Sequence, residues 1–209
     1  DVEFVGEQWP ALGRIDAGAT VQALAQPQPD AVFNVTFGAD LTNFVRQGNT
    51  RGLFERRSVV SMLTGEPEYL DPLGDETPEG WIVTGYPRDG IDTPAHKAFA
   101  DAYRAKFGEA PKCGSVVGYA LVNAIVAGLL KAGSTDSEAL VGGFRGAAFD
   151  TPFGRAMFRP QDHQATLGAY VGRLALRDGR GTMADWRYVD GAAALPSDDE
   201  VRALRTAPI

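Results

Sequence analysis

The fold is decided by residues 29–62, PDAVFNVTFGADLTNFVRQGNTRGLFERRSVVSM. Ala31–Val35 is an apolar run of strand length, and Ser58–Met62 is a second one. Between the two runs, apolar residues stand at the i, i+3 and i+4 spacing of a helix: Leu41, Phe44 and Val45. A strand, a helix and a strand joined by short connections predict parallel strands with a right-handed crossover, which is an α/β layer architecture.

The alternation continues on both sides of this stretch. Upstream, Val2–Gly6 suits a strand, and Asp16 can cap a short helix that Pro27 stops. Downstream, prolines and glycines predict an irregular segment over 65–80, and Trp81–Thr84 resumes strand character. The chain then reaches a candidate linker between domains, Tyr86-Pro87-Arg88-Asp89-Gly90.

The second half of the chain is richer in helix signals. Thr93 followed by Pro94 predicts a helix start, and residues 114–132 read as a long helix. Thr135–Glu138 has the pattern of a capping box for a third helix. The last quarter predicts three antiparallel strands, a hairpin turn and a second capping box: 156–159, 167–176, 183–189, Asp178-Gly179 and Ser197–Glu200.

The composition is typical of a globular protein with one or two domains, since 44% of the 209 residues are hydrophobic and 22% charged. The formal charge of -7 has no compensating basic cluster, so the sequence predicts no nucleic-acid partner and leaves acidic partners and small ligands open. Val116–Leu130 is shorter than the ~18 apolar residues of a membrane span and is interpreted as a core helix. The single Cys113 excludes an internal disulfide. The opening Asp1–Phe4 resembles the middle of a strand, so we expect targeting information to be missing from this sequence.

Catalytic and metal-binding signatures are absent from the sequence. It contains no G-x-S-x-G elbow, no P-loop, no G-x-G-x-x-G after a strand and no H-E-x-x-H. Of the two histidines, His96 is expected on a solvated helix face and His163 in a hydrogen-bonding role within a polar connection. The sequence therefore predicts a protein that is not an enzyme and carries no metal or cofactor.

A ligand site is expected where the predicted strands end. In open α/β sheets the site lies beyond the carboxyl ends of the strands, where loops meet helix N-termini. Aromatic surface mixed with hydroxyl groups is typical of a small-molecule pocket. An alternative is that Phe37 and Trp9 only cover the end of the sheet. Three loops supply the predicted ligand-binding residues: Trp9; Thr36, Phe37, Gly38 and Ala39; Ser61, Met62 and Leu63.

Nine segments, each weak alone, keep a specific order and spacing along nearly the whole chain: Pro29–Val32, Phe44–Gln47, Gly52-Leu53, Glu79–Trp81, Phe99–Pro111, Gly118–Ala120, Lys131–Ser134, Phe149–Gly154 and Asp162–Gln164. In this order they resemble the periplasmic solute-binding proteins of leucine/isoleucine/valine (branched-chain amino acid) ABC transporters.

The resemblance implies a type I periplasmic binding protein fold, with two α/β lobes, parallel sheets flanked by helices and three crossings between the lobes, incomplete in this chain. Residues 1–86 would belong to the second lobe, 87–157 would return to the first and 158–209 would go back to the second. Tyr86 and Pro87 would lie at the hinge. The family's function further implies a periplasmic receptor that delivers a small molecule to the permease subunits of an ABC transporter.

Two family positions bear on the ligand. The aromatic residue that lines the cleft corresponds to Phe37 or Gly38, and the acid that meets the ligand's ammonium falls near Ser61–Leu63, where no acid stands. A buried ammonium without a partner is costly. A carboxylate without an α-amino group, or an amide, therefore fits this stretch about as well as an amino acid does.

Three functions are alternatives to the transport receptor: a ligand-sensing regulator with the same fold, an α/β enzyme, and an interaction protein with a degenerate pocket. The resemblance also implies that the family's main carboxylate anchors lie in a missing N-terminal half. Because a truncated lobe exposes a sheet face or edge, we expect the 209-residue chain to be dimeric or accompanied by that half.

Overall fold

The computed structural model describes residues 2–206 and divides into two compact units. Unit 1 contains Asp1–Pro87 and Tyr170–Arg187, and unit 2 contains Arg88–Ala169 and Tyr188–Ile209, so the chain passes between the units three times. The assignment of residues 158–209 to the second lobe stays a prediction. Only residues 170–187 join unit 1, because they form strands that extend its sheet.

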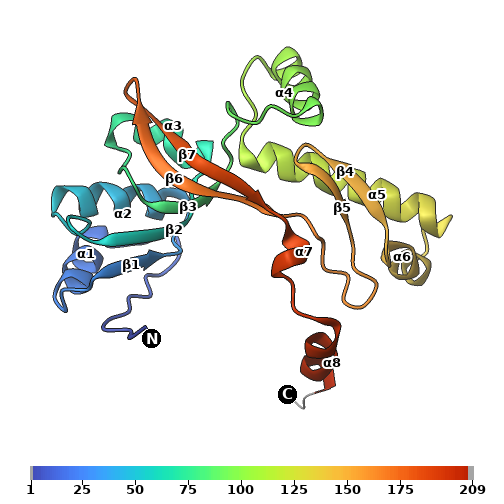
Figure 1. The fold of residues 1–209 in the computed structure, drawn as a ribbon, viewed down its shortest axis with the longest axis horizontal. Coiled ribbons are helices and arrows are strands. Elements are labelled where there is room, and N and C mark those ends of the chain that lie inside the picture. Colours follow the sequence, from blue (N-terminus) through green and yellow to red (C-terminus); the bar gives the residue numbers. More distant parts are fainter. Residues whose placement is uncertain (1, 207–209) are drawn as a thin grey trace. The chain divides into compact units, whose positions relative to one another are not determined.

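Unit 1 is built on a five-stranded sheet in the order β1-β2-β3-β6-β7 (Figure 1). The strands β1, β2 and β3 are parallel, and β6 runs antiparallel to β3. The elements of the unit are α1 (Ala17–Ala25), β1 (Ala31–Asn34), α2 (Gly38–Thr50), β2 (Ser58–Gly65), α3 (Pro67–Leu73), a 3₁₀ turn (Gly74–Glu76), β3 (Ile82–Gly85), β6 (Ala169–Arg177) and β7 (Arg180–Val189).

Local signals explain most of these elements. The carboxylate of Asp16 accepts a hydrogen bond from Ala19 N at 2.9 Å and caps α1 as predicted. Asp178 and Gly179, both with positive φ (51° and 73°), form the two-residue hairpin turn between β6 and β7. The helices turn their apolar faces into a core of fully or nearly fully buried side chains, among them Val21, Leu41, Phe44, Val45, Leu53, Leu73, Val83 and Leu174. Phe33, Val35 and Ile82 are exposed.

Unit 2 contains helices and a single hairpin. Its elements are α4 (Pro94–Phe107), α5 (Cys113–Ala132), α6 (Ser137–Phe144), β4 (Ala148–Thr151), β5 (Gly154–Met157), α7 (Gly191–Ala194) and α8 (Asp198–Thr206). The antiparallel strands β4 and β5 form the unit's two-stranded sheet. A small core joins α5 to this hairpin through Ala124, Phe149 and Ala156, with Phe158 and Leu167 packed beside them.

Helix α5 is the long helix that the sequence predicts, but its surroundings differ from a core helix. One stripe is buried, consisting of Val116, Ala120, Ala124 and Gly128. The remaining faces expose apolar side chains: Val117, Tyr119, Leu121, Val122, Ile125, Val126 and Leu130. By length and composition alone α5 could also cross a membrane, a test that core helices of soluble proteins pass as well. Within this chain, α5 is therefore a half-covered apolar helix.

Several local predictions were wrong. Residues 2–6 form no strand, because no neighbouring strand pairs with them and their side chains lie exposed. The segment predicted as irregular contains α3, since Pro67 occupies the first turn, where a proline is tolerated. Helix α6 is capped by Asp136, which accepts from Glu138 N and Ala139 N at 3.1 Å, and not by Thr135.

Candidate ligand site at the carboxyl edge of β1–β3

The parallel strands of unit 1 bring two of the three predicted loops to one edge. In the sheet register Asn34 of β1 lies opposite Ser61 of β2, and Ser61 lies opposite Val83 of β3. The loop after β1 and the end of β2 therefore leave the sheet side by side. This edge is the place where open α/β sheets hold ligands.

A continuous chain of side-chain hydrogen bonds runs beneath this edge. Thr36 Oγ1 donates to Asn34 Oδ1 at 2.8 Å, Asn34 Nδ2 donates to Ser61 Oγ at 2.8 Å, and the Ser61 and Thr64 hydroxyls lie 2.5 Å apart. Asn34, Ser61 and Thr64 are buried. Ser61, which the sequence placed in the ligand site, thus has no exposed surface for a ligand and instead supports the edge from below.

The end of β2 bulges away from β3. Ser61 pairs with Val83 and Gly65 pairs with Gly85. Between these pairs β2 therefore has three residues, Met62, Leu63 and Thr64, where β3 has only Thr84. Leu63 adopts a left-handed backbone conformation with φ +67°, and its N–H donates to Thr84 Oγ1 at 3.0 Å. The bulge leaves the Met62 side chain 38% exposed and that of Leu63 partly exposed. These two apolar side chains are what β2 presents at the edge.

Two glycines close the bulge. A Cβ on Gly85 would lie 2.2 Å from the carbonyl carbon of Gly65, and a Cβ on Gly65 would lie 2.6 Å from Met183 Sδ. Both positions therefore need a residue without a side chain. Neither glycine was singled out from the sequence, where they resemble ordinary strand ends.

The loop after β1 leads into α2. Phe37 is 49% exposed and precedes the first turn of α2 without a side-chain cap, and Gly38 and Ala39 are exposed. Gly38 has φ +62°, and its N–H donates to the hydroxyl of Tyr69 at 3.2 Å. The acid in the first turn of α2, Asp40, is buried and accepts hydrogen bonds from Gly13 N (2.7 Å) and Ile15 N (3.3 Å). Its carboxylate is thus committed to the preceding segment of the chain.

The third predicted loop is not joined to this edge. Trp9 is 84% exposed, and its indole N–H donates to Glu7 at 3.1 Å. Among the residues that the structure describes, no hydrogen bond or ring contact links Trp9 to the loops after β1 and β2. Its irregular segment has no strand to fix it there. The assignment of Trp9 to the site stays a prediction.

The two residues expected at the hinge end the first stretch of unit 1. Tyr86 and Pro87 are buried, and Tyr86 N donates to Gly65 O at 3.1 Å. The chain enters unit 2 at Arg88, directly after them.

The histidines do not form a catalytic or metal site. His96 was expected on a solvated face, but it is buried, and Nδ1 lies 3.2 Å from the Ile91 carbonyl oxygen. Burial lowers the pKa of His96. The His163 ring does not take its expected hydrogen-bonding role, since its buried Nε2 has no partner within residues 2–206. No group of His, Cys, Asp and Glu able to hold a metal occurs in that same range.

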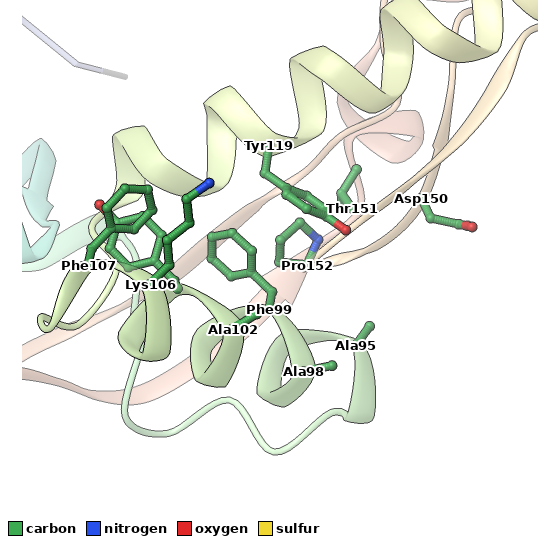
Figure 2. Close-up of a pocket in the computed structure, with 11 residues that line it drawn as sticks. Ala95, Ala98, Phe99, Ala102, Lys106, Phe107, Tyr119, Asp150, Thr151 and Pro152 are labelled. Carbon is green, nitrogen blue, oxygen red and sulfur yellow. The ribbon is translucent and has the colours of Figure 1, made fainter.

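A separate hollow of about 510 Å³ lies in unit 2 between α4 and α5, where the sequence predicts no site. Figure 2 shows Phe99 of α4 and Tyr119 of α5 in its wall, where the two rings pack against each other with centroids 5.1 Å apart. Its wall is mostly aromatic and alanine side chains, with Lys106 and Asp150 at the border. The hollow continues the exposed apolar surface of α5 and lacks the convergent polar groups that orient a small ligand.

Known proteins resemble this chain over most of its length. A leucine-, isoleucine-, valine-, threonine- and alanine-binding protein from Pseudomonas aeruginosa is 28% identical over 146 residues, covering 70% of this chain and 38% of that protein. An amino acid ABC transporter substrate-binding protein from Pseudomonas fluorescens superposes with a TM-score of 0.76 at 20% identity, covering 96% of this chain and 54% of that one.

A third relative is a solute-binding protein of an ABC transporter from Rhodopseudomonas palustris, solved with 3,4-dihydroxybenzoic acid. It superposes with a TM-score of 0.70 at 23% identity and covers 84% of this chain and 49% of its own. The two superpositions confirm the predicted fold. The chain spans about half the length of these solved structures, so the fold is incomplete in this chain. The model of the periplasmic binding protein family matches residues 1–180, and the chain belongs to that family.

Proposed function

We propose that the chain is part of the extracytoplasmic receptor of an ABC transporter and contributes one side of a small-molecule site at the carboxyl edge of β1–β3. The observation that carries the proposal is that Phe37 and Met62 are both exposed at this edge. Buried Asn34 hydrogen-bonds to Thr36 in one loop and to Ser61 in β2, and so holds the two segments together. Apolar surface beside a few fixed polar groups is what a small organic ligand requires.

The proposed ligand is a small carboxylic acid or its amide. The curated relative is named for amino acids, and the third relative was solved with an aromatic acid that has no amine. In this chain Met62 and Leu63 present apolar side chains at the end of β2, and the carboxylate of Asp40 is already bonded to two backbone N–H groups. A branched-chain amino acid and an acid without an α-amino group, or its amide, are therefore both candidates.

Closure is the proposed signal to the transporter. A ligand that contacts both lobes favours the closed state, and the permease subunits recognise that state without any chemical turnover. Tyr86 and Pro87, where the chain first changes unit, are the proposed hinge, with 1–86 as second-lobe sequence and 87–157 as first-lobe sequence.

The receptor requires more than this chain. Half of each solved relative lies outside the matched region, and α5 exposes apolar side chains on most of its circumference. A helix that is apolar all round is stable when buried. We therefore propose that an N-terminal half of the same protein, or a second copy of the chain, covers α5.

A thermal-shift screen of the full-length receptor tests the function. Leucine and 4-methylpentanoate form one matched pair of probes, and benzoate and 3,4-dihydroxybenzoate form another. At least one probe should raise the melting temperature, since a ligand present at 100 times its Kd adds about 2.7 kcal/mol to the folded state.

Two exposed phenylalanines provide a matched comparison for the location of the site. Phe37→Ala should reduce the ligand-induced shift, whereas Phe107→Ala in unit 2, 57% exposed, should leave it unchanged. If none of the four probes shifts the melting temperature, or if both variants reduce the shift equally, the proposed site is wrong.

A further inference from the structure

Leu63 stands out among the backbone conformations of unit 1. Of the non-glycine residues with positive φ within residues 2–206, it is the apolar one: the others are Gln28, Arg56, His163, Asp178 and Asp185. Asparagine, aspartate and histidine enter the left-handed region more readily than leucine does. A leucine in this conformation must be held there by its surroundings, and such positions cluster at binding sites.

Three neighbouring groups hold Leu63. Its N–H donates to Thr84 Oγ1 at 3.0 Å, and its carbonyl oxygen accepts from Glu66 N at 2.9 Å. The Ser61 and Thr64 hydroxyls, on either side of the turn, close it with a 2.5 Å contact. Both backbone polar groups of Leu63 are therefore satisfied outside the ladder between β2 and β3.

Two of the residues that hold Leu63 cannot contact a ligand, because Ser61 and Thr64 are fully buried. Thr84 is half-buried, and its hydroxyl oxygen accepts the Leu63 N–H. What reaches the surface is the pair of side chains that they position, Met62 and Leu63. The effect of Ser61 and Thr64 on a ligand must therefore be indirect.

The same network extends to the other loop of the edge. Asn34 donates to Ser61 and accepts from both the N–H (3.1 Å) and the hydroxyl (2.8 Å) of Thr36, the residue before Phe37. One buried chain of hydrogen bonds thus fixes both the Thr36–Phe37 loop and the Met62–Leu63 bulge.

We propose that Asn34, Ser61, Thr64 and Thr84 are positioning residues that set which small acids the receptor accepts, by fixing Leu63 in the left-handed conformation and thereby placing Met62 and Leu63 at the edge. The proposal rests on the ligand site proposed above. It assigns specificity to the hydrogen-bond network behind Met62 and Leu63, and not only to the side chains that reach the surface.

The test uses the full-length receptor and compares stability with ligand discrimination. Thr84→Val removes the acceptor for the Leu63 N–H while keeping the shape of the side chain, and Thr84→Ser restores the hydroxyl. The two probe pairs are leucine with 4-methylpentanoate, and benzoate with 3,4-dihydroxybenzoate. Isothermal titration calorimetry with the pair that binds the wild type better gives two Kd values for each variant. Thr84→Val should change the ratio of these Kd values by roughly tenfold, and Thr84→Ser should return it to the wild-type ratio.

Thr77 provides the matched control. It is a buried threonine whose hydroxyl donates to a backbone carbonyl, Gly74 O, at 2.8 Å, and it lies ahead of the amino end of β3. Thr77→Val should lower the unfolding midpoint in denaturant and leave the ratio of Kd values unchanged.

A second variant keeps the test decisive if Thr84→Val fails to fold. Glycine accepts φ +67° without strain, so Leu63→Gly should fold and should also change the ratio. If the wild type binds a probe but Thr84→Val or Leu63→Gly keeps the ratio within about twofold, the positioning role is wrong while the site stands. If the wild type binds none of the four probes, the proposed function fails and this inference fails with it.

Discussion

The two units of this chain contain similar amounts of apolar sequence but use it differently. In unit 1 the helices pack against one face of the sheet, so that Leu41, Phe44 and Val45 of α2 are almost completely inaccessible. The alternate positions of β1 and β3 are exposed, among them Phe33 and Ile82. In unit 2, α5 buries one stripe and leaves Leu121, Val122 and Leu130 in solvent. Unit 1 therefore contains a helix layer packed on one face of a sheet, whereas unit 2 leaves most faces of its longest helix uncovered.

The largest expected effect contrasts one apolar truncation in each unit. Phe44→Ala removes a buried ring that packs edge-on against Phe54 at 5.6 Å, and should cost about 3–5 kcal/mol of unfolding free energy. Leu130→Ala removes a side chain that is 80% exposed and should change the unfolding free energy by less than about 0.5 kcal/mol. Urea denaturation of the 209-residue chain measures both.

The outcome for Leu130 also reports on the covering of α5. A large loss of stability in Leu130→Ala, dependent on protein concentration, would show that a second copy buries this helix in solution. Sedimentation of the same samples identifies the oligomer, and a stable lone monomer would contradict the expectation that the chain associates.

Glycine substitutions sharpen the contrast with an effect of intermediate size. Gly85→Ala in unit 1 forces a Cβ to within 2.2 Å of the Gly65 carbonyl carbon, and should destabilise by about 1–3 kcal/mol. Gly118→Ala in α5 meets nothing within 4 Å and should stabilise by about 0.5–1 kcal/mol, because alanine restricts the unfolded chain. Thermal unfolding of the two variants should therefore shift in opposite directions.

Helix caps test whether the units respond alike when the chemistry is the same. Asp16 caps α1 and Asp136 caps α6, each through one carboxylate oxygen. Substitution by alanine should cost about 1 kcal/mol at either position. Hydrogen exchange separates the sites: Asp16→Ala should expose amides at the start of α1, and Asp136→Ala those at the start of α6. Exchange that changes throughout the chain in either variant would contradict a local role.

The smallest expected effect is a pH dependence confined to unit 2. Because the Ile91 carbonyl can only accept a hydrogen bond, neutral His96 carries its proton on Nδ1. Burial lowers the pKa of His96 below its usual 6.5, so the unfolded chain takes up a proton first as the pH falls. The associated stability is fully present above pH 6.5 and is lost as the pH falls through the lowered pKa.

Asparagine is the matched replacement for His96, because its amide nitrogen can take the place of Nδ1 and it does not titrate. Above pH 6.5 the unfolding free energies of His96→Asn and the wild type should depend on pH in the same way. Below pH 6.5 the unfolding free energy should fall in the wild type and should not show this fall in His96→Asn. A decline of the same slope in both proteins would assign it to other groups.

Elements with local signals could be predicted from the sequence. The Asp16 cap, the start of α4 at Thr93 and Pro94, and the Asp178-Gly179 turn each depend on side chains within a few residues, and the structure confirms all three. The capping box at Ser197–Glu200 is confirmed for the same reason, with Ser197 N donating to Glu200 at 2.7 Å.

The errors come from contacts between residues far apart in the sequence. The Val2–Gly6 pattern is that of a strand, but a strand needs a neighbour to pair with, and none is present for these residues. At the site, the loops after β1 and β2 could be predicted because parallel strands end at the same edge. The burial of Ser61 and the left-handed Leu63 could not, since they depend on Asn34 and on Thr84.

The pairing of β3 with β6 has a consequence for the order in which the protein folds as it is synthesised. Thr84 pairs with Val171, so residues 88–169 must leave the ribosome before β6 can reach β3. At ~5–20 residues per second this interval lasts roughly 4–16 s, during which β3 is an unpaired sheet edge. An early three-stranded sheet with an open edge can join another chain, so efficient folding depends on keeping nascent chains apart or on a chaperone that covers β3 until its partner strand arrives.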